Sequence, residues 1–119
     1  MAATYELRNM CPPLMSALNR ANALGLTGFP FASYAALKAA VAALFTGSTL
    51  AAVNKPEPRR QAVDVDKELD KFNAVGIVTS AVYGAASIAA ARTAVQALYV
   101  ANGGSGALSA NHAGSHLGD

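Results

Sequence analysis

Residues 72–91 read FNAVGIVTSAVYGAASIAAA, a stretch of twenty residues without a single charge. A second uncharged stretch runs from Ala39 to Asn54. The windows Ala35–Val53 and Ala74–Ala91 have an average hydropathy at the usual threshold for a membrane span. Each is close to the roughly 20 residues that a helix needs to cross a hydrocarbon core of about 30 Å. Both windows are rich in alanine, which favours helices. The sequence therefore predicts an all-α protein built on a hairpin of two long, alanine-rich transmembrane helices.

The rest of the chain is organised around this hairpin, and its 119 residues suit a single domain. Pro12 and Pro13 suit a first helical turn and Gly25 suits a position just after a helix, which predicts a short amphipathic helix between them. Ser33 is the expected N-cap of the first apolar helix. Five segments are predicted: a short helix and loop over 1–32, an apolar helix over 33–53, a proline-rich charged linker over 54–65, a long helix over 66–101, and a flexible glycine-rich tail over 102–119.

Charge is scarce and unevenly placed. Charged residues make up 13% of the chain, against about 25% in ordinary globular proteins. Ten of the sixteen charges lie between Lys55 and Lys71, where five positive and five negative residues cancel. The net charge is +2. No basic patch of the kind that binds nucleic acid can be built from the remainder, so nucleic acid is not an expected partner.

Four residues are expected to mark one membrane face. A hairpin would bring Lys38, near the start of the first span, level with Arg92, near the end of the second. Long cationic side chains at such positions extend to the interface, and tyrosines gather there. We therefore predict Lys38, Arg92, Tyr34 and Tyr99 as membrane-face anchors.

Small residues recur at fourfold spacing in the second span. On a continuous helix, Gly76, Ser80 and Gly84 would form one stripe that lets another helix approach closely. This spacing predicts a helix-packing face, although an alanine-rich chain produces such spacings easily by chance.

Motifs for catalysis, cofactor binding or metal binding are not found. Cys11 is the single cysteine, which leaves a structural role as the simplest interpretation. His112 and His116 have the spacing of a metal pair, but Gly114 and Gly118 argue against the helix that this pair would need. We predict no catalytic, cofactor-binding or metal-binding residues, no small-molecule substrate and no enzymatic activity.

These observations favour a non-catalytic accessory or structural subunit of a multisubunit membrane complex, with other protein subunits and lipid as partners. By class alone, respiratory and photosynthetic complexes fit, which suggests the mitochondrial inner membrane or the thylakoid membrane. One alternative is a filament or virion component, either a pilin-like hairpin or a phage structural or ejection protein. A second alternative is a soluble helical bundle whose uncharged helices are buried by self-association.

Overall fold

The computed structural model describes residues 4–46 and 56–108. In these two ranges, the regular secondary structure is entirely helical, which confirms the predicted all-α class. The helices are α1 (Thr4–Ala23), α2 (Tyr34–Thr46), α4 (Pro56–Ala74), α5 (Ser80–Tyr83) and α6 (Ile88–Ala101).

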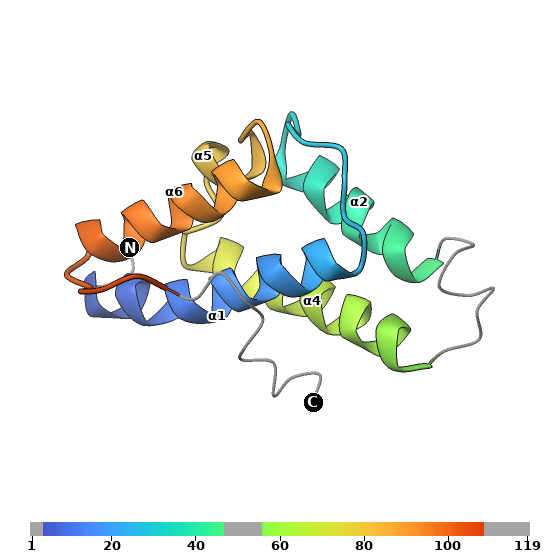
Figure 1. The fold of residues 1–119 in the computed structure, drawn as a ribbon, viewed down its shortest axis with the longest axis horizontal. Coiled ribbons are helices and arrows are strands. Elements are labelled where there is room, and N and C mark those ends of the chain that lie inside the picture. Colours follow the sequence, from blue (N-terminus) through green and yellow to red (C-terminus); the bar gives the residue numbers. More distant parts are fainter. Residues whose placement is uncertain (1–3, 47–55, 109–119) are drawn as a thin grey trace.

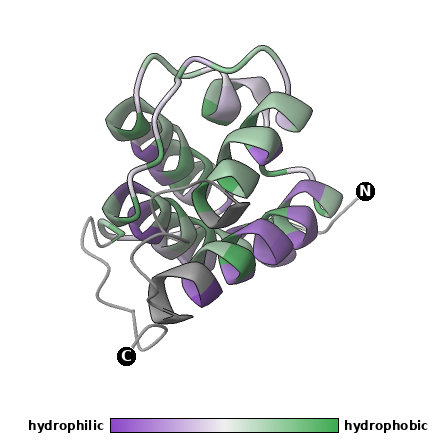
Figure 2. Ribbon diagram, turned by 90° about the vertical axis from the view of Figure 1, so that its right-hand side faces the viewer, coloured by the Kyte–Doolittle hydropathy of each residue, from purple (hydrophilic) through white to green (hydrophobic). Residues whose placement is uncertain are grey.

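The helices form a closed ring of contacts. Helix α6 packs on α1, α1 packs on α4, and α4 packs on α2. The short α5 closes the ring because it contacts both α2 and α6. In Figure 1, α1 and α4 lie below, and α6, α5 and α2 lie above them. Hydrophilic residues gather in the lower part of the view in Figure 2, whereas the upper helices are largely hydrophobic.

One hydrophobic core fills the ring, and every helix contributes to it. The largest fully buried side chains of this core are Leu14, Leu18, Leu37, Val41, Val65, Leu69, Phe72, Ile77, Val82 and Val95. The loop between α1 and α2 adds two aromatic rings, Phe29 and Phe31, which meet edge to face with their centroids 4.7 Å apart. The Phe31 N–H donates a hydrogen bond of 2.8 Å to the Tyr83 carbonyl, so this loop is tied to α5.

Helix α1 is longer than predicted, because it begins at Thr4 and continues through Pro12 and Pro13. A proline inside a helix removes one backbone hydrogen bond and is costly where the freed carbonyl is buried. Both prolines lie on the exposed side of α1, where water can satisfy those carbonyl groups. The opposite side carries the buried Cys11 and Leu14. The predicted start at the prolines is therefore wrong, whereas the predicted end at Gly25 is confirmed.

The predicted linker over 54–65 is also wrong for the residues described. Helix α4 begins at Pro56, with Pro58 in its first turn. Proline is well tolerated there, because the first N–H groups of a helix have no partner within it. The buried positions Ala62, Val65 and Leu69 recur at helical spacing. The charged residues from 60 to 71 thus belong to an amphipathic helix that buries Ala62, Val65 and Leu69 on its other side.

The predicted long helix over 66–101 is divided into α4, α5 and α6. The first break is at Gly76, whose φ of +88° lies in the left-handed region that glycine adopts without strain. The Gly76 N–H donates to the Asn73 carbonyl at 3.0 Å and the Ile77 N–H donates to the Phe72 carbonyl at 3.2 Å. These two bonds form a Schellman motif, which ends the helix and directs Ile77 into the core. A second break precedes α6, where the Ser87 hydroxyl caps the new helix by accepting from the Ala90 N–H at 3.1 Å.

The apolar helices are shorter than the predicted spans. Helix α2 has 13 residues and α6 has 14, whereas a span needs about 20. Ser33 caps α2 as predicted, since its hydroxyl accepts from the Ala36 N–H at 3.1 Å. Among the residues that the structure describes, no helix combines the length and the apolar character needed to cross a membrane. The remainder of the first predicted span, residues 47–53, lies outside the described residues.

Candidate functional site

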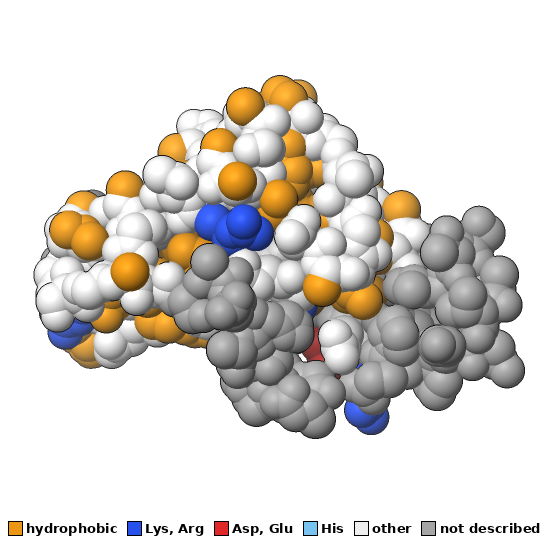
Figure 3. Space-filling model, in the orientation of Figure 1, with side chains coloured by type: hydrophobic (Ala, Val, Ile, Leu, Met, Phe, Trp, Pro, Cys, Tyr) orange, Lys and Arg blue, Asp and Glu red, His pale blue; other side chains and the backbone are white. Residues whose placement is uncertain are grey.

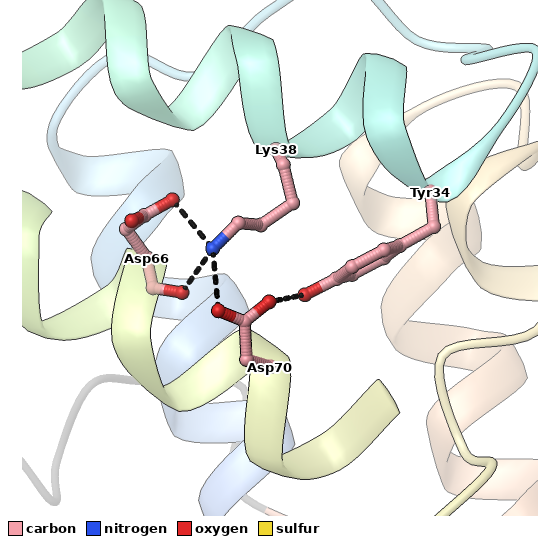
Figure 4. A network of polar contacts seen from close by, with 4 residues as sticks. All are labelled: Tyr34, Lys38, Asp66 and Asp70. Carbon is pink, nitrogen blue, oxygen red and sulfur yellow. Dashed lines mark hydrogen bonds and ion pairs between the residues drawn. The ribbon is translucent and has the colours of Figure 1, made fainter. Parts of the chain in front are cut away.

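The most extensive polar network described joins α2 to α4 and is centred on Lys38 (Figure 4). The Lys38 ammonium lies 2.8 Å from Asp66 Oδ1 and 3.1 Å from Asp70 Oδ2. It also donates a hydrogen bond of 2.7 Å to the Asp66 carbonyl. The Tyr34 hydroxyl donates to Asp70 Oδ1 at 2.7 Å. We call these four residues the lysine clamp, because they fix one side of α2 against α4.

The ionisation states of the clamp support one another. The hydrogen bond from Tyr34, followed by that from Lys38, lowers the pKa of Asp70. Burial alone would lower the pKa of Lys38, but its two carboxylate partners outweigh this effect and raise it. Burial, followed by the hydrogen bond to Asp70, raises the pKa of Tyr34. Near neutral pH the clamp therefore holds a charged lysine, a charged Asp70 and a neutral tyrosine.

The clamp leaves the outer face of α2 without charge. Lys38 is the only charged residue of this helix, and its side chain is turned toward α4. The outer face presents Ala35, Ala39 and Ala43, which are exposed and follow one another at intervals of four residues. We call these three residues the α2 face. A surface helix normally carries charged or polar residues on the side that faces water.

Helix α6 has a similar outer surface. Its exposed residues include Ala89, Thr93, Ala97 and Val100, of which Val100 is 54% exposed. Its single charge is Arg92, which lies half-buried beside this surface. Figure 3 shows hydrophobic side chains scattered over the upper part of the molecule, with few charged side chains between them on the described part of this face. We call the exposed residues of α6 the α6 face.

A second polar contact joins α1 to α4, and sequence reasoning did not find it. The Arg20 guanidinium, from the last turn of α1, pairs with the carboxylate of Glu68 on α4. Arg20 is 2% exposed, and its Nε atom has no hydrogen-bond partner in the part of the chain that the structure describes. A buried arginine needs a carboxylate partner, because an unpaired charge in the interior is strongly unfavourable. The signal in the sequence is the placement of Arg20 between two apolar residues, Leu18 and Ala21, which are buried.

The predicted helix-packing stripe does not exist as a stripe. Gly76 lies in the turn after α4, Ser80 begins α5, and Gly84 is the C-cap of α5. The three residues therefore occupy turns and helix ends. At Gly84 an added Cβ would lie 2.7 Å from the Ser80 carbonyl oxygen, so the close neighbour there is the glycine's own turn.

The structure brings together two of the four predicted anchors. Tyr34 and Lys38 meet in the lysine clamp, while Arg92 and Tyr99 lie on α6. Their anchoring role at a membrane stays a prediction. Cys11 is buried and donates its S–H to the Leu7 carbonyl at 3.3 Å, and burial raises the pKa of its thiol, as suits a structural cysteine. His112 and His116 lie outside the described residues, and no cluster of metal-ligating side chains occurs among those that are described.

Comparison with known proteins finds no match to this chain among family models, curated proteins or solved structures. The function therefore has to be argued from the clamp and from the two uncharged faces.

Proposed function

We propose that this protein is a non-catalytic structural or accessory subunit of a larger assembly, and that the α2 face and the α6 face contact its neighbours. The observation that carries the proposal is the direction of Lys38. The one charged side chain of α2 is used inside the molecule, and the outward positions are left to alanine. An exposed helix face without charge is typical of an interaction site, whereas a helix face that meets only water is usually charged or polar.

The shape of the two faces suits helix packing. Axes of packed helices lie 8–10 Å apart on average, and small side chains at the contact allow the shorter separations. Alanine also costs little side-chain entropy when it is covered. The ion pairs in the lysine clamp and between Arg20 and Glu68 connect helices of the chain to one another. This use of charge supports a structural role.

A charge placed on each face tests the proposal. Glutamate at Ala39 or at Ala97 would be solvated in a free monomer but unpaired in a helix–helix contact. We expect Ala39→Glu and Ala97→Glu to remain folded and to lose the partners that the wild-type chain retains in native purification. The matched control is Asn9→Glu, a neutral-to-acidic change at an exposed position of α1. A wild-type chain that is monomeric in cross-linked cells would overturn the proposal.

The composition of the purified assembly separates this proposal from its alternatives. One copy among different subunits identifies an accessory subunit. A helical polymer of the chain alone identifies the filament or virion component. A closed oligomer of a few copies identifies the self-associating helical bundle. All three use the uncharged faces, so the glutamate variants apply to each.

The finer form of the proposal places the assembly in a membrane, in contact with lipid. It needs spans that none of the described helices provides. Sedimentation of cell extracts without detergent tests this form directly. If the chain pellets with membranes and resists extraction by salt and alkali, the membrane form stands, and if it stays in the supernatant, that form is wrong.

A further inference from the structure

The chain reverses direction at the end of α6 and returns along that helix. Gly103, with a φ of +95°, directs the turn, and the Gly104 N–H donates to the Tyr99 carbonyl at 2.8 Å. Gly104 lies directly against the Tyr99 ring, because an added Cβ would come within 2.5 Å of it. Further along, residues 106 and 108 contact Gln96. We call residues 103–108 the strap, and it runs antiparallel to α6.

Gln96 holds the strap by its backbone. Its side-chain Nε2 donates to the Gly106 carbonyl at 3.1 Å, and its Oε1 accepts from the Leu108 N–H at 2.7 Å. The two bonds lie on either side of Ala107 and use only backbone atoms of the strap, so they select a backbone course, with Gly106 at a φ of +85°, and no particular side chain at position 107. Specificity comes from Leu108, which is half-buried and packs against the hydrophobic core.

Arg92 lies one turn before Gln96, on the same side of α6. Residues 92, 96 and 99 are spaced by four and three, which places them on one helix face. Arg92 is half-buried, and its guanidinium makes no ion pair or hydrogen bond with another residue that the structure describes. One helical turn, about 6 Å, separates it from Gln96, which equals about two residues of extended chain. The two residues that follow Leu108 are Ser109 and Ala110, neither of which is charged.

We propose that this surface, formed by Arg92, Gln96 and Tyr99, is a docking site for an extended segment of another subunit, and that the strap is the chain's own occupant of it. The segment that fits has an aliphatic side chain in the place of Leu108 and a carboxylate about two residues later. This carboxylate pairs with Arg92, an interaction that Ser109 and Ala110 cannot supply. The added ion pair allows a segment of a neighbouring subunit to displace the strap. The inference rests on the proposed subunit role and names the chemistry of one partner.

The test uses the full-length protein and two fluorescent peptides. One peptide has the sequence of residues 103–110, and the other carries Ala110→Asp. The variant Leu108→Ser removes the side-chain anchor of the strap and opens the site, because the tethered strap otherwise competes at an effective concentration in the millimolar range. We expect the acidic peptide to bind Leu108→Ser about tenfold more tightly than it binds the wild-type chain, by fluorescence anisotropy.

Two further variants identify the contacts. On the Leu108→Ser background, Arg92→Gln should abolish an advantage of about fivefold that the acidic peptide has over the neutral one, as expected for a partly exposed ion pair. On the same background, Gln96→Ala should weaken both peptides alike. If Leu108→Ser does not fold, the acidic peptide is titrated against the wild-type chain and against Arg92→Gln. We then expect it to bind the wild-type chain about fivefold more tightly than Arg92→Gln.

Three outcomes overturn the proposal. Binding that is unaffected by Gln96→Ala shows that the peptides bind elsewhere. Equal affinity of the two peptides excludes an acidic partner and leaves the strap of a second copy as the occupant. No binding to a folded Leu108→Ser variant shows that the surface accepts only its own tethered strap. These readouts are independent of the α2 face, so loss of assembly in Ala39→Glu and loss of peptide binding can occur separately.

Discussion

Removal of the Glu68 carboxylate should be among the most damaging polar substitutions in this protein. The Arg20 guanidinium, which is 2% exposed in the wild-type chain, loses its ion-pair partner in Glu68→Ala, and its Nε has no hydrogen-bond partner among the described residues. Breaking a buried pair from one side costs about 3–5 kcal/mol, because a charge is left uncompensated in the interior. The Glu68 side chain is 27% exposed, so water can enter where it is removed. We therefore expect a loss of about 3 kcal/mol in the free energy of unfolding.

Urea unfolding followed by circular dichroism measures this loss. The matched control is Asp64→Ala, which removes a carboxylate one turn earlier on α4 and should change stability by no more than about 0.5 kcal/mol. The double variant Arg20→Met/Glu68→Met replaces the pair with apolar side chains of similar length. It should recover to within about 1 kcal/mol of the wild-type chain or exceed it. A cost of Glu68→Ala below about 1 kcal/mol, or a double variant as unstable as the single one, would refute the argument from buried charge.

Three further predictions concern the fold and its pH dependence. Gly76→Ala should lower the free energy of unfolding by about 1–2 kcal/mol, since the left-handed backbone strains alanine although nothing lies within 4 Å of the new Cβ; urea titration of both proteins measures it. Phe72→Ala should cost about 3–5 kcal/mol, because this ring is 2% exposed at the centre of the core, and a smaller loss in the same assay would show that the core closes over the cavity. The pKa of Asp70 lies below its ordinary value of 3.8 in the folded chain, so its charged form stabilises the fold at higher pH, and this contribution is lost as the pH falls through the folded-state value. Asp70→Asn should therefore lose less stability than the wild-type chain between about pH 5 and pH 2, and parallel curves would contradict the role of the lysine clamp.

The helical class and several helix ends could be predicted because their signals are local. Ser33 caps α2 by a bond to a backbone N–H three residues away, and Gly25 ends α1 through its own backbone angle. Neither depends on the remainder of the fold. Prolines are harder to interpret, because their effect depends on which side of a helix they occupy. Pro12 and Pro13 are tolerated within α1 since their side faces water, a fact that only the packing of α1 against α4 and α6 determines.

The division of the long predicted helix shows why hydropathy alone was insufficient. Residues 72–91 are uncharged over their whole length, and an average over that window cannot show where the chain turns. The turn at Gly76 places Ile77 and Val78 in the core, and α5 then follows as a separate helix. The same segment thus supplies Phe72, Ile77 and Val82 to the core of a small helical ring, while many of its other residues are exposed. A glycine within an apolar run can be a packing position or a helix end, and the sequence does not distinguish these two roles.

The candidate site was missed in part because its residues were assigned to separate places. The sequence predicts Lys38 and Tyr34 at a membrane face, and it places Asp66 and Asp70 at the start of the long helix, next to the charged linker. The pairing of α2 with α4 joins all four. Because Lys38, the single charged residue of α2, pairs with α4, the outer face of α2 carries no charge. On α6 the strap covers part of the helix, and its far end is held by the Gln96 amide and the Leu108 side chain. Contact through the α2 face therefore requires no rearrangement of the described residues, whereas contact through the strap site must displace a segment that is already bound.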